Sequence, residues 1–410
     1  MSFQTGLSGL NAASKSLDVI GNNIANANTV GMKSSRVEFA DLVASSLGTG
    51  GTGGSNAGIG VSVAKVSQQF TQGNLSITGN NLDVAINGGG FFEVTRSDGS
   101  LAYTRDGQFK LDKDGGLITN TGASVMGYAT DFLGAPTSIT PVKMSLPTGA
   151  PIAASPTTTV SAEFNLDARA AVAAVAVPPT PRTTYGTSIT TFDAQGAEVP
   201  VSLYFERVAP TGTGVTARDN WDVYNTPTGG TALFQMQFDA TGKLKAPATA
   251  FTLTIPTPSP TTPDISAQLD VSKVTQFGTA FNVSNLTQNG YSSGELTGIT
   301  ISPKGTITTR YSNGQTQARG QLALADFRNV QGLTPVGGGE FTETFASGQP
   351  LLGNPGIGKF GELRAGAVEE SNVDLTAELV NMMTAQRAYQ ANAQTIKTQD
   401  QILSTLVNLR

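Results

Sequence analysis

Large apolar residues recur at every seventh position along the last part of the chain, from Ser371 to Arg410. The line and the positions that widen it are Leu375, Leu379, Met382, Tyr389, Ile396, Leu403 and Leu406. No Gly or Pro interrupts this stretch, and Asn372 and Asp374 precede it as candidate N-caps. The pattern predicts one amphipathic helix of about 36 residues, roughly 54 Å long, whose apolar stripe needs a partner.

The beginning of the chain, residues 1–30, carries the same period. Its apolar line and flanking positions are Phe3, Leu7, Leu10, Leu17, Ile20 and Ile24. An Asn-rich stretch follows. Because Asn side chains compete for backbone hydrogen bonds, we expect the helix to end between Asn26 and Gly31, which are therefore hinge or turn candidates. Matching heptad stripes at the two ends predict coiled-coil pairing, within one chain or between chains. The alternative is a pair of amphipathic helices packed on one globular core.

Between the two ends the period of the apolar pattern changes from seven to two. After an expected short helical piece at Val37 to Leu47 and a Gly-rich linker at residues 48–58, alternation begins at Val61. Asp-Gly pairs spaced along the following segment predict a β-meander of short hairpins. Strand patterns resume from Phe277, and Pro- and Thr-rich stretches bound the region before it. That region is predicted to be an all-β domain with Trp221 in its core.

The chain is therefore predicted to be multidomain, with terminal α-helical coiled-coil segments and two mainly-β domains nested as successive insertions. The expected helical domain joins residues 1–30 to residues 371–410. Connecting segments are expected at 31–70 and 360–370. The remaining expected parts are an inner β-domain that joins 71–143 to 277–359, and an outer inserted β-domain at 144–276.

Composition limits the chemistry that this chain can perform. The 410 residues include no Cys and no His, and only 13% are charged, with a net charge of −5. Thiol chemistry, the commonest general base and the commonest metal ligand are thus all excluded. Asp112 and Asp114 resemble the start of a calcium loop, but Gly116 and Leu117 occupy positions where a ligand and the turn Gly belong. We expect no catalytic residue, no metal and no cofactor.

Charge and hydropathy also limit the partners. Mild acidity without a Lys/Arg cluster argues against nucleic acid. No apolar run approaches about eighteen residues, which argues against membrane insertion. The N-terminus lacks the basic and apolar regions of a secretory signal, so a secreted chain of this kind would leave by a route that needs no cleaved signal. Low charge with many small polar residues is typical of an extracellular polymer subunit rather than a cytosolic enzyme.

Several motifs resemble the bacterial flagellar rod and hook family of axial proteins. At the start these are the stretches Leu7 to Ala13, Leu17 to Asn26 and Thr29 to Lys33. At the end they are Ser371 to Met382, Ala385 to Gln390 and Asp400 to Leu403. These terminal motifs are shared by rod and hook members. Three internal motifs, Gln288 to Tyr291, Tyr311 to Gly314 and Ala325 to Phe327, resemble the hook members, as does the Pro-bounded middle domain.

The resemblance implies a structural subunit that is exported unfolded by the flagellar type III apparatus. Such subunits polymerise outside the cell into a curved, flexible, hollow tube that acts as a universal joint and transmits torque from the motor to the filament. The implied partners are other copies of the chain, the distal rod, the hook cap, the hook–filament junction proteins and the export apparatus. A distal rod subunit is the alternative within the family. An extracellular β-rich adhesin would leave the paired terminal stripes unexplained. A polysaccharide hydrolase would need a pair of carboxylates, and no acidic pair in this sequence stands in a suggestive context.

Overall fold

The computed structural model describes residues 2–43, 58–147, 149, 151–174, 180–214 and 217–408, so the expected Gly-rich linker at 48–58 lies outside them except for its last residue. The chain divides into two compact units. The first comprises Met1–Gly149, Gly298–Arg310 and Thr316–Arg410, and the second comprises Ala150–Thr297 and Tyr311–Gln315.

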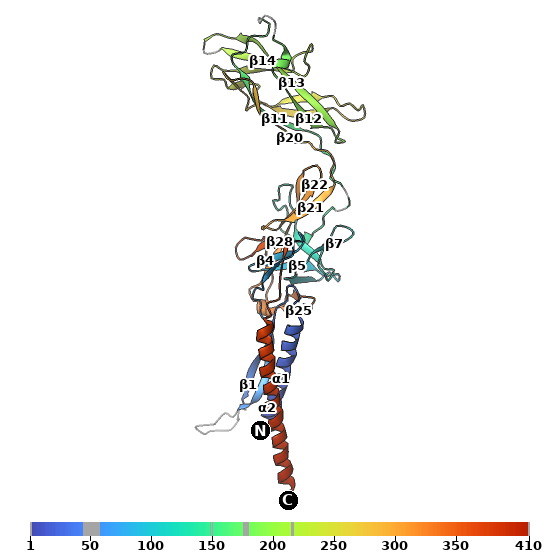
Figure 1. Ribbon diagram of the computed structural model, residues 1–410, viewed down its shortest axis with the longest axis vertical. Helices are drawn as coiled ribbons and strands as arrows, with labels where there is room; N and C mark the ends of the chain where they lie inside the picture. Colours follow the sequence, from blue (N-terminus) through green and yellow to red (C-terminus); the bar gives the residue numbers. More distant parts are fainter. Residues whose placement is uncertain are drawn as a thin grey trace. The chain divides into compact units, whose positions relative to one another are not determined.

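A long helix stands at each end of the described chain. Helix α1 spans Ser2–Ala25 and helix α2 spans Leu375–Asn408, and the two lie side by side and antiparallel (Figure 1). Gly6 near the start of α1 faces Ile396 of α2. Because α2 is the longer helix, its last turns extend beyond the start of α1.

The end of α1 and the start of α2 agree with the capping signals in the sequence. Asp374 accepts hydrogen bonds at Oδ1 from the backbone N–H groups of Thr376 and Ala377, at 2.9 and 3.1 Å, so the predicted cap at this residue is confirmed. Helix α1 ends at Ala25, where the Asn-rich stretch begins to form turns. Local hydrogen-bonding preferences therefore account for both boundaries.

A two-stranded antiparallel hairpin, β1 (Ser35–Val43) and β2 (Gly58–Gln68), packs on α1. The helical piece expected at Val37 to Leu47 is therefore wrong over its described part, which belongs to β1. Pairing with β2 satisfies the backbone of this segment, and tertiary pairing overrides a weak helical pattern. Gly60 lies directly against the side chain of Ser8 in α1, where no other residue would fit without displacement.

The first unit contains one large sheet, in which many neighbouring strands are not consecutive in sequence, and two small sheets. The large sheet and its side branches consist of β5 (Phe91–Thr95), β6 (Leu101–Thr104), β7 (Lys110–Leu111), β8 (Leu117–Ile118), β9 (Ser124–Tyr128), β10 (Val142–Lys143), β21 (Leu296–Ile301), β22 (Thr306–Tyr311), β23 (Thr316–Leu322), β24 (Leu324–Asp326), β25 (Thr334–Gly337), β26 (Glu340–Thr342) and β27 (Leu351–Gly353). The small sheets pair β3 (Leu75–Ile77) with β29 (Ala367–Glu369) and β4 (Val84–Asn87) with β28 (Glu362–Ala365). A 3-10 turn, η3 (Val330–Gly332), precedes β25. Strands from before and after the second unit thus pair with each other.

Two apolar clusters fill the first unit. The larger includes Val84, Phe92 and Ile307, all fully buried. The smaller is mainly aromatic, and its rings meet edge to face, as Tyr103 and Phe327 do with centroids 4.8 Å apart. The Arg105 guanidinium lies 5.1 Å from the centre of the Phe91 ring and pairs with Glu369, so this aromatic cluster adjoins the segment that leads into α2.

The second unit is built from two sheets that share one core. The first sheet contains β11 (Thr159–Asp167), β17 (Phe251–Ile255), β18 (Ile265–Asp270), β19 (Thr275–Phe277) and β20 (Asn282–Gln288), and the second contains β12 (Gly186–Phe192), β13 (Glu198–Thr211), β14 (Arg218–Tyr224), β15 (Phe234–Phe238) and β16 (Leu244–Ala246). The short 3-10 helix η1 (Arg182–Thr184) precedes β12. Trp221 is fully buried in the shared core, as predicted. The expected domain boundary at residue 276 is too early, because β20 pairs with β11.

Candidate assembly site

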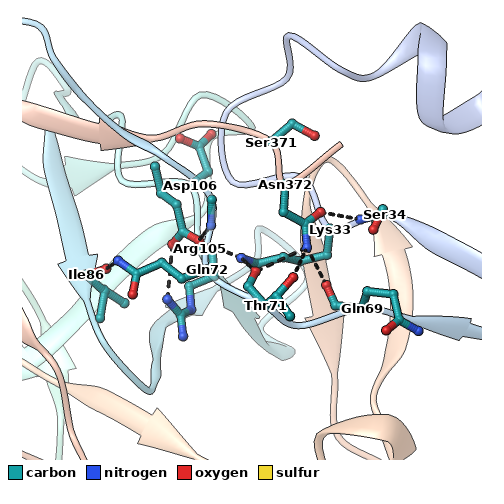
Figure 2. A network of polar contacts seen from close by, with 12 residues as sticks. Lys33, Ser34, Gln69, Thr71, Gln72, Ile86, Arg105, Asp106, Ser371 and Asn372 are labelled. Carbon is teal, nitrogen blue, oxygen red and sulfur yellow. Dashed lines mark hydrogen bonds and ion pairs between the residues drawn. The ribbon is translucent and has the colours of Figure 1, made fainter. Parts of the chain in front are cut away.

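Segments that are distant in sequence meet at a buried ion-pair network in the first unit (Figure 2). The ammonium of Lys33, just before β1, lies 2.6 Å from Oε1 of Glu369 at the end of β29 and donates to the Thr71 carbonyl at 2.7 Å. Arg105, just after β6, lies 3.0 Å from Oε2 of the same carboxylate and donates to the Gly88 carbonyl at 3.0 Å. The network therefore joins the segment after α1 and the segment before α2 to the β-structure.

One buried carboxylate pairs with two buried cations here, and the three side chains are at most 6% exposed. Burial lowers the pKa of the Lys33 ammonium, and the negative charge of Glu369 opposes that shift. Burial also lowers the pKa of the Arg105 guanidinium, again opposed by Glu369. Removing Glu369 would leave two buried cations without their counter-charge, which is far more costly than losing a surface ion pair.

Asn372, in the segment between β29 and α2, makes hydrogen bonds beside this network. Its Oδ1 accepts a hydrogen bond from the Ser34 N–H at 2.7 Å, and its Nδ2 donates to the carbonyls of Gln69 at 2.7 Å and Thr71 at 3.1 Å (Figure 2). The sequence marked Asn372 as a candidate N-cap, but Asp374 performs that role. Asn372 instead links three separate backbone segments.

The two predicted turn residues lie where α1 gives way to this junction. Asn26 is one residue beyond the helix, and its N–H donates to the Asn22 carbonyl at 3.1 Å. Gly31 has φ +70°, and its N–H donates to the Glu369 carbonyl at 2.8 Å. A Cβ at Gly31 would lie 2.5 Å from the backbone nitrogen of Asp106. Both the backbone conformation and the close approach therefore require Gly at this position.

Asn23 provides a further link that the sequence pattern did not reveal. This side chain is 1% exposed, and it exchanges two hydrogen bonds with the Ser35 backbone, at 2.8 and 2.9 Å. Its Nδ2 also lies 3.3 Å from Oε1 of Glu378 in the first turns of α2. One buried amide thus holds α1, β1 and α2 together.

Within one chain, α1 meets α2 through small residues rather than through its line of large ones. A Cβ at Gly6 would lie 3.1 Å from Cγ1 of Ile396, and one at Gly9 would lie 2.8 Å from Nδ2 of Asn392. Ala13, in the same helix, is 8% exposed. Small side chains let two helix axes approach closely, so this face is the one that packs in the isolated chain.

The predicted seam residues consequently differ in burial. Leu10, Leu17, Ile20, Ile24, Met382 and Ile396 are half-buried. Phe3, Leu7, Leu375, Leu379, Tyr389 and Leu403 are exposed. The side chain of Leu406 lies outside the described part of the structure. The single chain therefore leaves much of both apolar lines in contact with solvent.

The sequence patterns do not identify the three members of the buried ion-pair network, which are Lys33, Glu369 and Arg105. Charged residues are sparse in this chain, and Lys33 closes a terminal motif in which it is the only charged residue. That isolation was a usable signal for Lys33 alone. Nothing local identifies Glu369 or Arg105 as its partners, because the contacts span 336 and 264 positions of the sequence.

Clusters of metal ligands and membrane-crossing helices are both absent from the part of the chain that the structure describes. No three carboxylates among the described residues converge as metal ligands would. None of the helices described is both apolar enough and long enough to cross a bilayer. The ion pairs and the amide links of Asn23 and Asn372 hold the junction ends of the two helices against the β-structure.

Comparisons with known proteins agree with this architecture. Family models match residues 3–33 (flagella basal body rod protein), 85–167 (flagellar hook protein FlgE/F/G D1 domain), 165–291 (flagellar basal body protein FlaE D2 domain) and 364–409 (flagellar basal body rod FlgEFG protein C-terminal). The flagellar hook protein FlgE of Escherichia coli is 42% identical over the full length of both chains. That of Treponema pallidum is 33% identical over 100% of this chain and 99% of its own.

The chain belongs to the flagellar hook protein family. It is a structural component of the bacterial flagellar hook rather than an enzyme, and the rod and adhesin alternatives are not favoured. The crystal structure of the Helicobacter pylori flagellar hook protein FlgE2 has a TM-score of 0.56 and 15% identity, and covers 70% of this chain and 99% of that one. At that identity the likeness concerns the fold alone. It agrees with helices at the ends and mainly-β domains between them.

Proposed function

We propose that copies of this hook subunit polymerise by packing the exposed apolar lines of α1 and α2 against the same helices of neighbouring copies. The observation that carries the proposal is the exposure of large apolar side chains on helices whose ends are firmly anchored. Leu379 is 51% exposed, Met383 53% and Leu403 50%. Exposure of these side chains to water is unfavourable in an isolated chain, because apolar surface gains free energy when it is buried. Contiguous apolar exposure is typical of an interaction surface.

In the proposed polymer the heptad lines form coiled-coil seams between copies. Within a chain, the small-residue face of α1 covers Ile396 of the α2 line and leaves the exposed heptad positions of both helices for contacts between chains. Leu403 continues the line of Ile396 toward the free end of α2, whose last turns extend beyond the start of α1. The apolar stripe of this extension therefore has its partner on another copy.

The second unit is proposed to be an insertion in the first, and the first an insertion between the helices. This nesting is supported by strand pairs such as β4 with β28 and β3 with β29, which join residues before the second unit to residues after it. Both ends of the chain are then free to pack in the polymer while the β-units extend from it.

A contact between unlike surfaces whose rotation does not close produces a helical polymer, here a curved hollow tube outside the cell. The low charge of the chain favours many weak contacts between β-units, which can shift as the tube bends and transmits torque. By family, the tube adjoins the distal rod, the hook cap and the hook–filament junction proteins, and its subunits pass through the type III export apparatus.

Electron microscopy of polymers grown from the purified full chain tests this function. Curved hollow tubes are the expected product. Straight rods would favour the distal-rod alternative, and a chain that stays monomeric at high concentration would contradict the proposal. Limited proteolysis supplies a second readout, because the ends of the chain should be cleaved in dilute monomer and protected in the polymer.

A further inference from the structure

Large apolar side chains stand exposed in one short segment of the first unit, residues 344–358. Phe345 is fully exposed, Leu351 is 56% and Ile357 62% exposed, and Leu352 is 38% exposed. The segment contains no charged residue, and Glu343 and Lys359 border it. A contiguous stretch that is both apolar and uncharged differs from the scattered exposed apolar residues of an ordinary surface.

The turn that carries Phe345 is held firmly by hydrogen bonds. Thr344 N–H bonds to the Ser347 hydroxyl oxygen at 2.9 Å, and the Thr344 hydroxyl donates to the Gly332 carbonyl at 2.7 Å. Asn329 Nδ2 donates to the carbonyl of Ala346 at 3.0 Å. The ring of Phe345 therefore projects from an ordered turn, so its anchoring in a partner would cost little conformational entropy.

The same segment supplies an open sheet edge. Within the described residues, β27 pairs with β24 on one side and with no strand on the other. Protein edges of this kind are normally blunted by a charged side chain, a bulge or a covering element. Here Leu351 and Leu352 are exposed on the edge strand itself, and Pro350 and Pro355 flank it. The prolines limit extension of the strand but leave its apolar side chains uncovered.

We infer that residues 344–358 form a subunit contact of the β-region, with a second copy of this chain as the occupant. The inference rests on the proposed polymerisation, which places an identical chain beside every copy. A segment without charge has no electrostatic means of selecting an acidic or basic partner, and it avoids like-charge repulsion when the same chain repeats around a tube. The contact is separate from the helical seam, and Phe345 serves as its aromatic anchor.

Two substitutions with a matched control test this contact. Phe345→Asp and Leu351→Asp each put a charge in the segment, and each should raise the critical concentration for polymerisation of the full chain by about tenfold or more. Leu101→Asp makes the same change at another exposed position, 42% exposed on β6, and should leave polymerisation near wild type. Thermal unfolding of the monomeric variants should match that of the parent. Unchanged polymerisation of both variants, or a clear loss of monomer stability, would overturn the inference.

Cross-linking identifies the occupant directly, because a chain without Cys accepts a single labelled site. Phe345→Cys carrying a photoreactive benzophenone should give covalent dimers in the assembled polymer and none in dilute monomer. A polymer of this variant that yields no dimers contradicts the inference while leaving the proposed function intact. If the wild-type chain itself forms no polymer, the proposed function and this contact fail together.

Discussion

The second β-unit and the terminal helices dispose of their apolar residues in opposite ways. In the second unit the strands alternate, as β18 does, with Ile265, Ala267 and Leu269 fully buried between two sheets. Along α2, by contrast, Leu375, Leu379 and Met383 are each between 44% and 53% exposed. The β-unit closes its core with its own residues, and the helices do not.

Under the proposed assembly, this contrast assigns stability to the closed β-core and polymerisation to the open apolar lines of the helices. A closed core resists changes in its surroundings, whereas an open apolar line gains free energy only when a neighbour covers it. The buried network of Lys33, Glu369 and Arg105 connects the closed β-structure to the segments that carry the open helices. It keeps the helices attached to a stable β-structure while their apolar lines stay available.

Leu403→Asp should have the largest effect of all on polymerisation, since it changes only the exposed apolar line of α2. The helix extension that carries Leu403 has no partner within the described chain, so monomer unfolding should be unchanged. In the polymer the substitution buries an unpaired charge at every subunit, at a cost of roughly several kcal/mol per contact, and elongation should stop. Lys397→Asp on the exposed face is the control, and sedimentation of polymers is the measurement. Equal defects from the two changes would refute the seam.

Lys33→Met should have the next largest effect, and it should appear in the monomer. Arg105 would remain as the counter-charge of Glu369, but the buried hydrogen bonds of Lys33 to Glu369, at 2.6 Å, and to the Thr71 carbonyl, at 2.7 Å, would be lost. We expect urea unfolding to show a loss of about 2–3 kcal/mol in the stability of the first unit. The control is Lys15→Met, which removes the same charge from an exposed position of α1. A comparable loss in both variants would mean that the buried pair contributes no more than a surface charge.

Gly9→Val should separate the contact within the chain from the contact between chains. The new side chain would collide with Asn392 of α2, and overpacking of this kind costs about 1–3 kcal/mol. Gly21→Val in the same helix meets nothing within 4 Å and serves as the control. Circular dichroism at 222 nm should show the helices of the first variant melting earlier. If both variants melt alike, α1 and α2 do not pack through this face in solution.

Glu93→Gln should give the smallest effect, and it tests how one buried carboxyl group changes the stability of the closed β-structure. Burial raises the pKa of Glu93, with the nearby charge of Glu343 as a second cause, and its Oε2 has no partner among the described residues. Because the folded-state pKa is raised, the contribution of Glu93 is fully present below the usual Glu pKa and is lost as pH rises through the raised value.

At neutral pH the Gln variant should therefore be more stable than the parent by about 1 kcal/mol. The gain should shrink as the pH falls toward the ordinary range of a Glu side chain. Thermal melts at several pH values measure it. A constant difference across that range would show that Glu93 does not titrate with folding.

The sequence was sufficient where the deciding interactions are local or periodic. Asp374 as a cap of α2 and the end of α1 near Asn26 follow from chemistry within a few positions of each. Trp221 in the core of the middle region follows from the alternation around it. The segment at Val37 shows the limit of local signals, because pairing with β2 made a strand of a stretch whose own pattern favoured a helix.

Patterns in the sequence alone predict an amphipathic helix at each end, β-structure between them, and the family. A period of seven identifies which residues share a face of a helix, and it does so without reference to any partner. The folded chain was needed to show that Gly6 and Gly9 form the face between α1 and α2. It was also needed to show that Lys33, Arg105 and Glu369 meet. Those contacts join residues hundreds of positions apart, and their energies depend on burial and distance, which no local pattern encodes.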